Sequence, residues 1–210
     1  MAFDVAARLA EGGPALADFE NFTWAVRALG YQNPDLTMHA AQIRDLYGTE
    51  DGLDLQALEA DADALSQLAS LAGEALRAEA ERMVELAGAW NGQAAESARE
   101  FLRRHRDSAA AVSAAVQEAA GALSTLRDQL WHAVDAKVDT VQAIDGRCGP
   151  QRAEWLAAAH TVLAGGGDRA AASEIVDQRV RPFVEGDIGS EWVSAMQTST
   201  ASVAGRHGRR

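Results

Sequence analysis

The chain has 210 residues and a formal net charge of −12, from 31 acidic and 19 basic residues. A charge of this sign repels the phosphate backbone, so we expect no nucleic-acid partner. Alanine accounts for 46 residues and aromatic side chains for only 6% of the chain. This composition excludes a β-sandwich or barrel and favours closely packed helices, and we therefore predict an all-α protein.

The first segment, residues 1–52, reads as short helices that pack on the rest of the protein. Gly12-Gly13-Pro14 ends the first of them, and a second runs to about Leu29. Asn33-Pro34-Asp35 predicts the start of a third helix that ends near Tyr47.

Two long amphipathic helices follow, and together they form the second segment, residues 53–146. From Leu55 to Ala89 the apolar residues recur at spacings of three, four and seven, which marks one helix face. From Val112 to Ile144 they alternate in steps of four and three, with Lys137 as the interruption. A repeat near 3.5 predicts a seam that packs against another helix.

The expected partner of this seam is the preceding long helix, so we predict an elongated bundle built on an antiparallel helical hairpin. The residues that we expect to form the seam or a partner interface are all apolar. They are Phe101, Val112, Val116, Leu123, Leu126, Leu130 and Val134.

The third segment, residues 147–210, is predicted to be helical with a basic tail. One helix runs to about Leu163, and Asp168 begins another that extends to about Val180. Pro182 is expected to end or kink that helix, and Ser190 to start a last amphipathic piece.

The tripeptide Trp90-Asn91-Gly92 stands between the two long helices and suits a tight reversal. Gly92 accepts the positive φ that such turns need, and Asn91 tolerates the same region. Trp90 lies on the same helix face as Leu86 and Met83, so its ring is expected to close the open end of the hairpin.

This arrangement resembles the WXG-type family, the helical-hairpin substrates of type VII (ESX-like) secretion in actinobacteria and firmicutes. The resemblance covers residues 54–144 and includes the small residues after the turn, Ala94, Ala95 and Ala98, followed by Phe101. It implies a non-enzymatic protein that acts through its helix faces, with two hairpins in a four-helix bundle. The flanking segments could instead supply the covering helices, as in larger single-chain substrates of such systems.

The chain departs from the family in its export signal, Tyr-x-x-x-Asp/Glu, which usually follows the second helix. Tyr31 with Asp35 and Tyr47 with Asp51 have this spacing, but both pairs precede the hairpin, so they are weak candidates. Residues 1–10 lack the uninterrupted apolar core of a usual secretory signal peptide. We therefore expect secretion to the medium or cell surface by a signal-peptide-independent route, with a cytoplasmic location as the alternative.

We predict no catalytic site, metal or cofactor. Asp128, His132 and Asp135 share one helix face and could bind zinc or manganese with an outside ligand, but we interpret them as a polar stripe because a fourth ligand is lacking. The basic cluster Arg103-Arg104-His105-Arg106 is interpreted as a solvated face that pairs with Glu100 and Asp107.

The leading functional hypothesis is a type VII secretion-associated substrate or partner protein. Its partner would be a protein, bound through helix faces in a homo- or hetero-oligomer, or the secretion machinery itself. A cytosolic adaptor or chaperone of such a system is the first alternative. A metal-binding protein and a membrane-active helical protein are the others, the latter because neutralised carboxylates let amphipathic helices insert.

Overall fold

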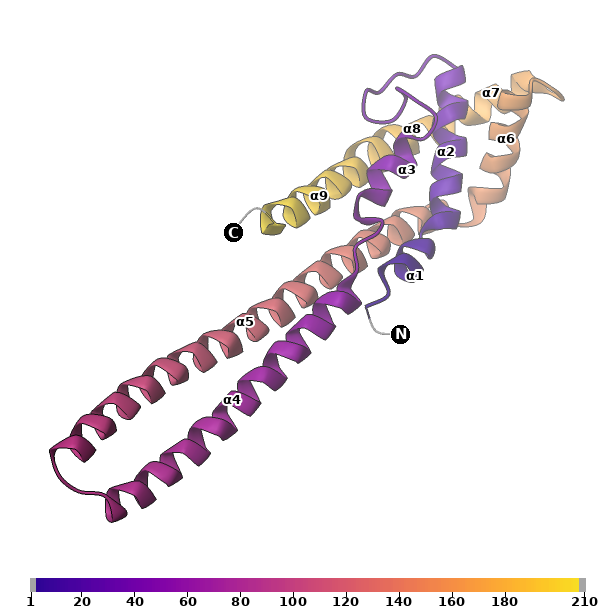
Figure 1. Cartoon of the computed structure of the whole chain (residues 1–210). Helices are drawn as coiled ribbons and strands as arrows, with labels where there is room; N and C mark the ends of the chain where they lie inside the picture. Colours follow the sequence, from indigo (N-terminus) through magenta and orange to yellow (C-terminus); the bar gives the residue numbers. More distant parts are fainter. Residues whose placement is uncertain (1–2, 208–210) are drawn as a thin grey trace. The chain divides into compact units, whose positions relative to one another are not determined.

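The computed structural model describes residues 3–207, and every regular element in this range is helical (Figure 1). The all-α prediction is therefore confirmed. The α-helices are α1 (Val5–Ala10), α2 (Gly13–Ala28), α3 (Gln42–Tyr47), α4 (Leu55–Ala89), α5 (Gln93–Gly146), α6 (Arg152–Ala164), α7 (Arg169–Ile175), α8 (Arg181–Phe183) and α9 (Val193–His207). Short 3-10 helices occupy Gly48–Glu50 and Gly149–Gln151, and π-helical segments occupy Val176–Val180 and Val184–Trp192. Of the predicted basic tail, residues 208–210 lie outside the described range.

The chain forms two compact units. The core unit contains the residues up to Asp54 and those from Leu130 onward, and the helix-pair unit contains Leu55–Gln129. The segments 1–52 and 147–210, which the sequence analysis treats separately, thus belong to one unit. Helix α5 is shared, because its last turns lie in the core unit and the rest in the helix pair.

An aromatic cluster lies at the centre of the core unit. Phe19 and Phe22 of α2 meet Trp155 of α6, Phe183 of α8 and Trp192 of the second π segment. The ring centroids of Phe22 and Trp155 are 6.0 Å apart and nearly perpendicular, and those of Phe19 and Trp192 are also 6.0 Å apart. Such edge-to-face contacts add to the burial of the large rings, so this cluster is a main source of stability for the unit.

The last turns of α5 supply a second part of this core. Their inward-facing residues are completely buried, at the steps of three and four that the sequence shows. They are Leu130, Val134, Val138, Val141 and Ile144.

The C-terminal segment differs from the prediction, because it stays helical without a break from Arg169 to His207. Asp168 does cap this helix, and its carboxylate accepts a hydrogen bond from the Ala171 amide at 3.1 Å. Pro182 does not end it, and Ser190 lies inside the second π segment rather than at a cap. A wider π turn directly precedes Pro182, which relieves the clash between a proline ring and the carbonyl four residues earlier.

The predicted third helix is also shorter than expected. Turns occupy the chain from Pro34 to Ala41, and α3 begins only at Gln42. The Asn33 side chain accepts a hydrogen bond from the Asp35 amide at 2.8 Å, while the Thr37 hydroxyl accepts one from the Asn33 amide at 2.9 Å. These local side-chain bonds replace helical ones, as Asn and Thr often do at turns.

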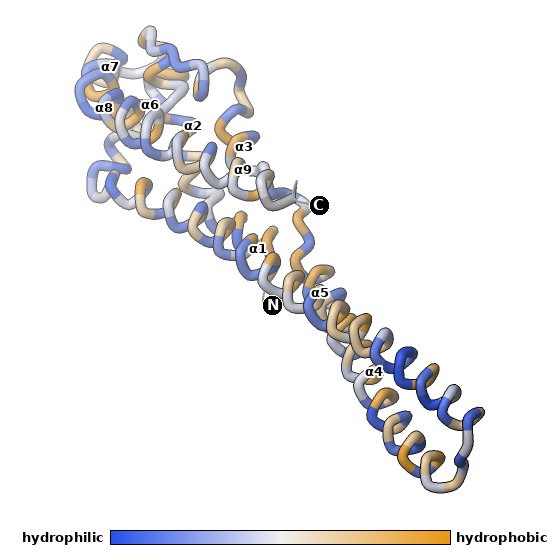
Figure 2. Tube along the Cα trace, turned by 90° about the vertical axis from the view of Figure 1, so that its left-hand side faces the viewer, coloured by the Kyte–Doolittle hydropathy of each residue, from blue (hydrophilic) through white to orange (hydrophobic). Residues whose placement is uncertain are grey.

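In the helix-pair unit, α4 and α5 run antiparallel (Figures 1 and 2). Arg127 pairs with Glu59 at 3.3 Å, and the Ser113 hydroxyl donates to the Ala69 carbonyl at 3.3 Å. Hydrophobic and hydrophilic residues intermingle along both helices in Figure 2, as expected of amphipathic helices. In the described part of the chain, no helix combines the length and apolar character of a membrane span.

Candidate functional site

Small side chains are buried where α5 meets α4. Ala95 and Ala120 of α5 are buried, as are Ala62 and Ala69 of α4. The Ser113 hydroxyl contacts the α4 backbone on this face. Small residues let the helix backbones approach each other, so the alanine-rich composition serves the contact between α4 and α5.

Two large apolar residues of α5 lie to one side of this contact. Val112 precedes the buried Ala120 by eight residues, which at 3.6 residues per turn places it about 80° around the helix. Val112 and Phe101 expose 64% and 63% of their surfaces. These two residues of the predicted seam therefore do not face α4 directly.

The other predicted seam residues divide along the helix. Val116, Leu123 and Leu126 in the helix pair are half-buried. Leu130 and Val134 in the core unit are completely buried. The apolar stripe of α5 is thus covered at its C-terminal end, partly covered from Val116 to Leu126, and exposed at Val112 and Phe101.

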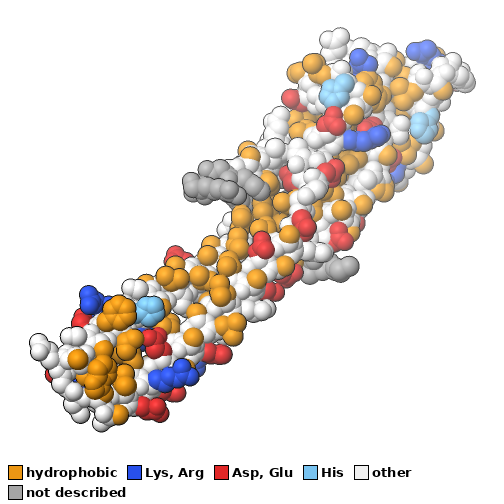
Figure 3. Space-filling view, viewed as in Figure 1, with side chains coloured by type: hydrophobic (Ala, Val, Ile, Leu, Met, Phe, Trp, Pro, Cys, Tyr) orange, Lys and Arg blue, Asp and Glu red, His pale blue; other side chains and the backbone are white. Residues whose placement is uncertain are grey.

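Leu68 of α4 lies on the same side of the helix pair as Val112. Leu68 precedes the buried Ala69 by one residue, which turns it about 100° in the same sense as Val112 is turned on α5. When two helices run antiparallel, residues rotated by a similar angle and in the same sense about each helix axis, starting from the contact face, lie on the same side of the pair. We call this surface the open seam; Figure 3 shows hydrophobic side chains along this unit. It consists of Leu68, Phe101, Val112, Val116, Leu123 and Leu126.

The connection between α4 and α5 consists of Trp90, Asn91 and Gly92. Gly92 has a φ of +104°, a backbone region that favours glycine. The Arg99 guanidinium donates to the Ala87 carbonyl at 3.3 Å and also to the Trp90 carbonyl, so it satisfies the last carbonyls of α4. Trp90 is 42% exposed, so the end of the pair is only partly covered by its ring.

The tyrosines of the weak export-signal candidates are engaged inside the core unit. Tyr47 is buried, and its hydroxyl donates to the Leu9 carbonyl at 2.9 Å. Burial raises the pKa of Tyr47 to about 12. Tyr31 is half-buried and its hydroxyl accepts a hydrogen bond from the Asn33 amide group at 3.1 Å. Asp35 and Asp51 are exposed.

Lys137, the interruption of the α5 repeat, forms a buried ion pair with Glu50. Its ammonium group also donates to the Tyr47 carbonyl at 2.7 Å and to the Thr49 hydroxyl at 2.9 Å. All three of its protons are therefore used, which leaves no free amine to act as a nucleophile. Burial lowers the pKa of Lys137 below its ordinary value, and the Glu50 carboxylate opposes this shift.

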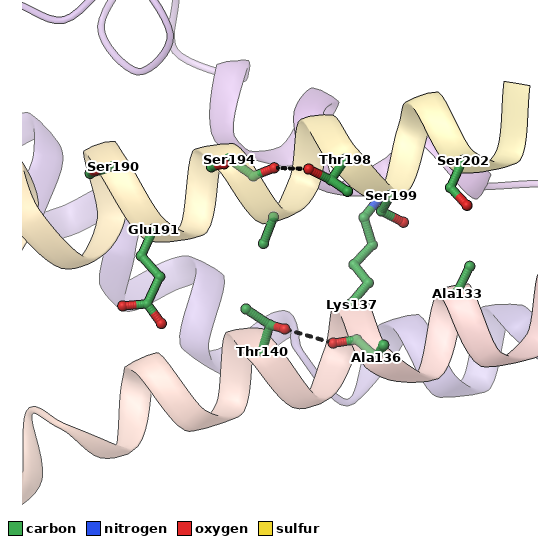
Figure 4. A pocket seen from close by; sticks show the side chains of 11 residues that line it. Ala133, Ala136, Lys137, Thr140, Ser190, Glu191, Ser194, Thr198, Ser199 and Ser202 are labelled. Atoms are coloured by element: carbon green, nitrogen blue, oxygen red, sulfur yellow. Dashed lines mark hydrogen bonds between the residues drawn. The ribbon is translucent and has the colours of Figure 1, made fainter. Parts of the chain in front are cut away.

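A groove of about 580 Å³ lies between α5 and α9 in the core unit (Figure 4). Its walls are small or hydroxyl-bearing, and Lys137 reaches into it from α5. Glu191 at its edge is held by Arg147 at 2.7 Å. The groove contains hydroxyls and a saturated ammonium group but no base next to a nucleophile among the residues that line it. The walls are formed by Ala133, Ala136, Thr140, Ser190, Ser194, Ala195, Thr198, Ser199 and Ser202.

The acidic side chains of the polar stripe have arginine partners. Asp135 accepts from Arg8 at 2.7 Å, and Asp128 accepts from Arg127 at 2.7 Å. Within residues 3–207 no group of three histidine, cysteine, aspartate or glutamate side chains has the geometry of a metal site.

Comparisons with protein-family models, curated proteins and solved structures gave no match to the chain.

Two functional features were not identified from the sequence. Arg99, which ties the turn to α4, stands seven residues beyond Gly92, and an arginine just after a predicted turn could have indicated such a cap. Glu50, the partner of Lys137, carried no signal, because it lies 87 residues away in the sequence.

Proposed function

We propose that this protein is a non-enzymatic, type VII secretion-associated protein that binds a helical partner through the open seam. The observation that carries the proposal is the difference in burial along the apolar stripe of α5. Leu130 and Val134 are buried, whereas Val112 and Phe101, on the same stripe, expose about two-thirds of their surfaces. Apolar surface of this kind is stabilised when a partner removes it from water.

The type of partner follows from the geometry of the open seam. Its residues lie along two antiparallel helices at helical spacings, so a helix that presents its own apolar stripe fits them best. A second copy of the chain or another helical protein of the same secretion system meets this requirement.

The assignment to type VII secretion rests on the resemblance to the WXG-type family. In this proposal α4 and α5 are the family's helical hairpin, and Trp90-Asn91-Gly92 is its turn motif. The positive φ of Gly92 and the position of the tripeptide between two long helices support this correspondence. We further propose that the protein leaves the cell with its partner, since Tyr47 is buried and cannot serve as an accessible signal residue.

Site-specific photo-crosslinking in an actinobacterial host with a type VII system tests the proposal. The photo-reactive residue p-benzoylphenylalanine replaces Val112 in one variant of the full chain and Ala114 in the matched control. Ala114 is also exposed but lies on the other side of α5. We expect a single crosslinked product from position 112, and its mass distinguishes a second copy from another protein.

The same strains separate the alternatives. Appearance of the chain in the medium, lost when the secretion ATPase is deleted, supports export. A product at position 112 with all protein retained in the cell supports a cytosolic adaptor instead. Equal crosslinking from positions 112 and 114, or none from either, contradicts the proposed use of the open seam.

A further inference from the structure

The helix pair carries a second groove, on the side opposite the open seam. Arg103 follows the buried Ala95 by eight residues, so it is turned about 80° in the opposite sense to Val112. The groove has a volume of about 440 Å³. We call it the basic groove. It is lined by Ala80, Met83, Val84, Ala87, Glu96, Arg99, Glu100, Arg103 and Arg106.

The α4 wall of the basic groove is apolar. All of its lining residues from α4 are hydrophobic, and Val84 among them is 75% exposed. Met83 beside it is half-buried and has a flexible side chain that adapts to different partners. This wall therefore offers an apolar contact, with Val84 largely exposed to solvent.

The α5 wall carries three arginines against two glutamates, Glu96 and Glu100, so its net charge is positive. Arg103 pairs with Glu100 at 2.8 Å and with Asp107 at 3.1 Å. Arg106, in contrast, forms no ion pair with any residue between 3 and 207. The Nε atom of Arg99 is buried and has no hydrogen-bond acceptor among the described residues. Because the Arg99 Nε atom is buried, Arg106 is the arginine of the groove whose charge is open to a ligand.

The charge of this wall stands out against the rest of the chain. Four arginines lie within residues 99–106, where Figure 2 shows a strongly hydrophilic run near the start of α5. Helix α4 carries seven acidic and only two basic residues, and the whole chain has a net charge of −12. An acidic ligand is repelled by most of the molecule and attracted to this wall.

We infer that the basic groove binds an acidic amphipathic helix of a partner protein. Apolar side chains of that helix pack on Met83 and Val84, and a carboxylate on its flank pairs with Arg106 and Arg103. A groove between two antiparallel helices, apolar on one wall and basic on the other, matches a helix with one apolar and one acidic edge. The site is separate from the open seam, so both can be occupied together.

Fluorescence anisotropy with the full chain tests this inference. The probe is a labelled 16-residue peptide helix with leucines at spacings of three and four and glutamates along one edge. Arg106→Glu is expected to weaken binding about tenfold or more, which corresponds to roughly 1.4 kcal/mol. Val84→Asp is expected to weaken it similarly, and raising the salt concentration to weaken it further.

Two matched variants serve as controls. Arg82→Glu makes the same charge change at an exposed arginine of α4 outside the groove, and it should leave binding unchanged. Val112→Glu alters the open seam and should also leave peptide binding unchanged. Failure of the open-seam crosslink would therefore not affect this result.

Three outcomes would overturn the inference. Equal weakening by Arg106→Glu and Arg82→Glu would show non-specific attraction. Equal binding of a peptide with the same residues in scrambled order would show that no helical edge is recognised. Binding to phosphatidylglycerol vesicles, with none to the peptide, would assign the groove to a membrane surface.

Discussion

The Lys137 ammonium group and the Glu50 carboxylate form an ion pair in which both side chains are shielded from solvent. Lys137 lies on α5 and Glu50 in the 3-10 helix that follows α3, so the pair joins the N-terminal segment to the long helix. A buried pair costs much of its attraction in desolvation, but removal of one partner leaves the other charge buried and uncompensated.

Lys137→Met is therefore expected to lower the free energy of unfolding of the core unit by about 3–5 kcal/mol. The double variant Lys137→Met/Glu50→Leu should recover most of that loss, because it removes both charges. Urea unfolding followed by circular dichroism measures both effects. A single variant as stable as the parent protein would show that the pair carries no net energetic role.

A second prediction concerns alkaline pH. Burial raises the pKa of Tyr47 to about 12 and that of Cys148 to about 11, from ordinary values of 10.0 and 9.0. Between the ordinary and the raised pKa of each group, the folded state holds more protons than the unfolded chain. The free energy of unfolding therefore falls as the pH rises from about 9 to 12. Lys137, whose pKa is lowered, acts in the opposite sense between its folded pKa and 10.5.

Tyr47→Phe isolates the tyrosine contribution, since Lys137 and Cys148 are common to both proteins. At pH 7 the variant loses the hydrogen bond to Leu9 and should be less stable by about 0.5–1.5 kcal/mol. Above pH 10 the difference should shrink and then reverse. Urea midpoints at several pH values measure it, and parallel curves for the two proteins would contradict the assignment.

A third prediction concerns the turn between α4 and α5. Gly92→Ala places a side chain at a φ of +104°, although no atom within 4 Å would touch it, so the effect comes from the backbone alone. We expect a loss of about 1–2 kcal/mol. Gly88→Ala, inside α4 and equally free of contacts, should stabilise the pair by about 0.5–1 kcal/mol. Thermal melting monitored at 222 nm compares the two, and shifts of the same sign would refute the backbone argument.

A fourth prediction contrasts two phenylalanines. Phe22 is completely buried in the aromatic cluster, and Phe22→Ala should cost about 3–5 kcal/mol. Phe101 is 63% exposed, and Phe101→Ala should change the stability of the isolated chain by no more than about 0.5 kcal/mol. A large loss with Phe101→Ala would mean that the open seam is already covered in the free protein.

The parts of the fold that the sequence predicts well are those with long periodic patterns. The bounds of α4 and the end of α5 follow from Asp54, Asp145-Gly146 and uninterrupted apolar spacing. Shorter elements were less predictable. The loop before α3 depends on hydrogen bonds of Asn33 and Thr37, and the continuous helix through Pro182 depends on a π turn, neither of which has a periodic signal.

The candidate site was harder to predict from the sequence, for a different reason. The repeat from Val112 to Val134 marks one apolar face of α5, but a repeat does not specify which element covers that face. In the helix pair, Ala95 and Ala120 of α5 are buried, whereas Val112 and Phe101 of the repeat stay exposed. Likewise, Lys137 as an interruption of the repeat is compatible with either an exposed or a buried charge, and only the distant Glu50 decides between them.

The burial of Lys137 also determines how the protein responds to amine-directed chemistry. It is the one lysine in the sequence, so acylating reagents, lysine-specific cross-linkers and lysyl endopeptidase have no accessible side chain to attack while the core unit is folded. Modification at this position requires the packing around Lys137 in the core unit to open. The rate of acylation at Lys137 therefore reports how often this part of the core unit opens.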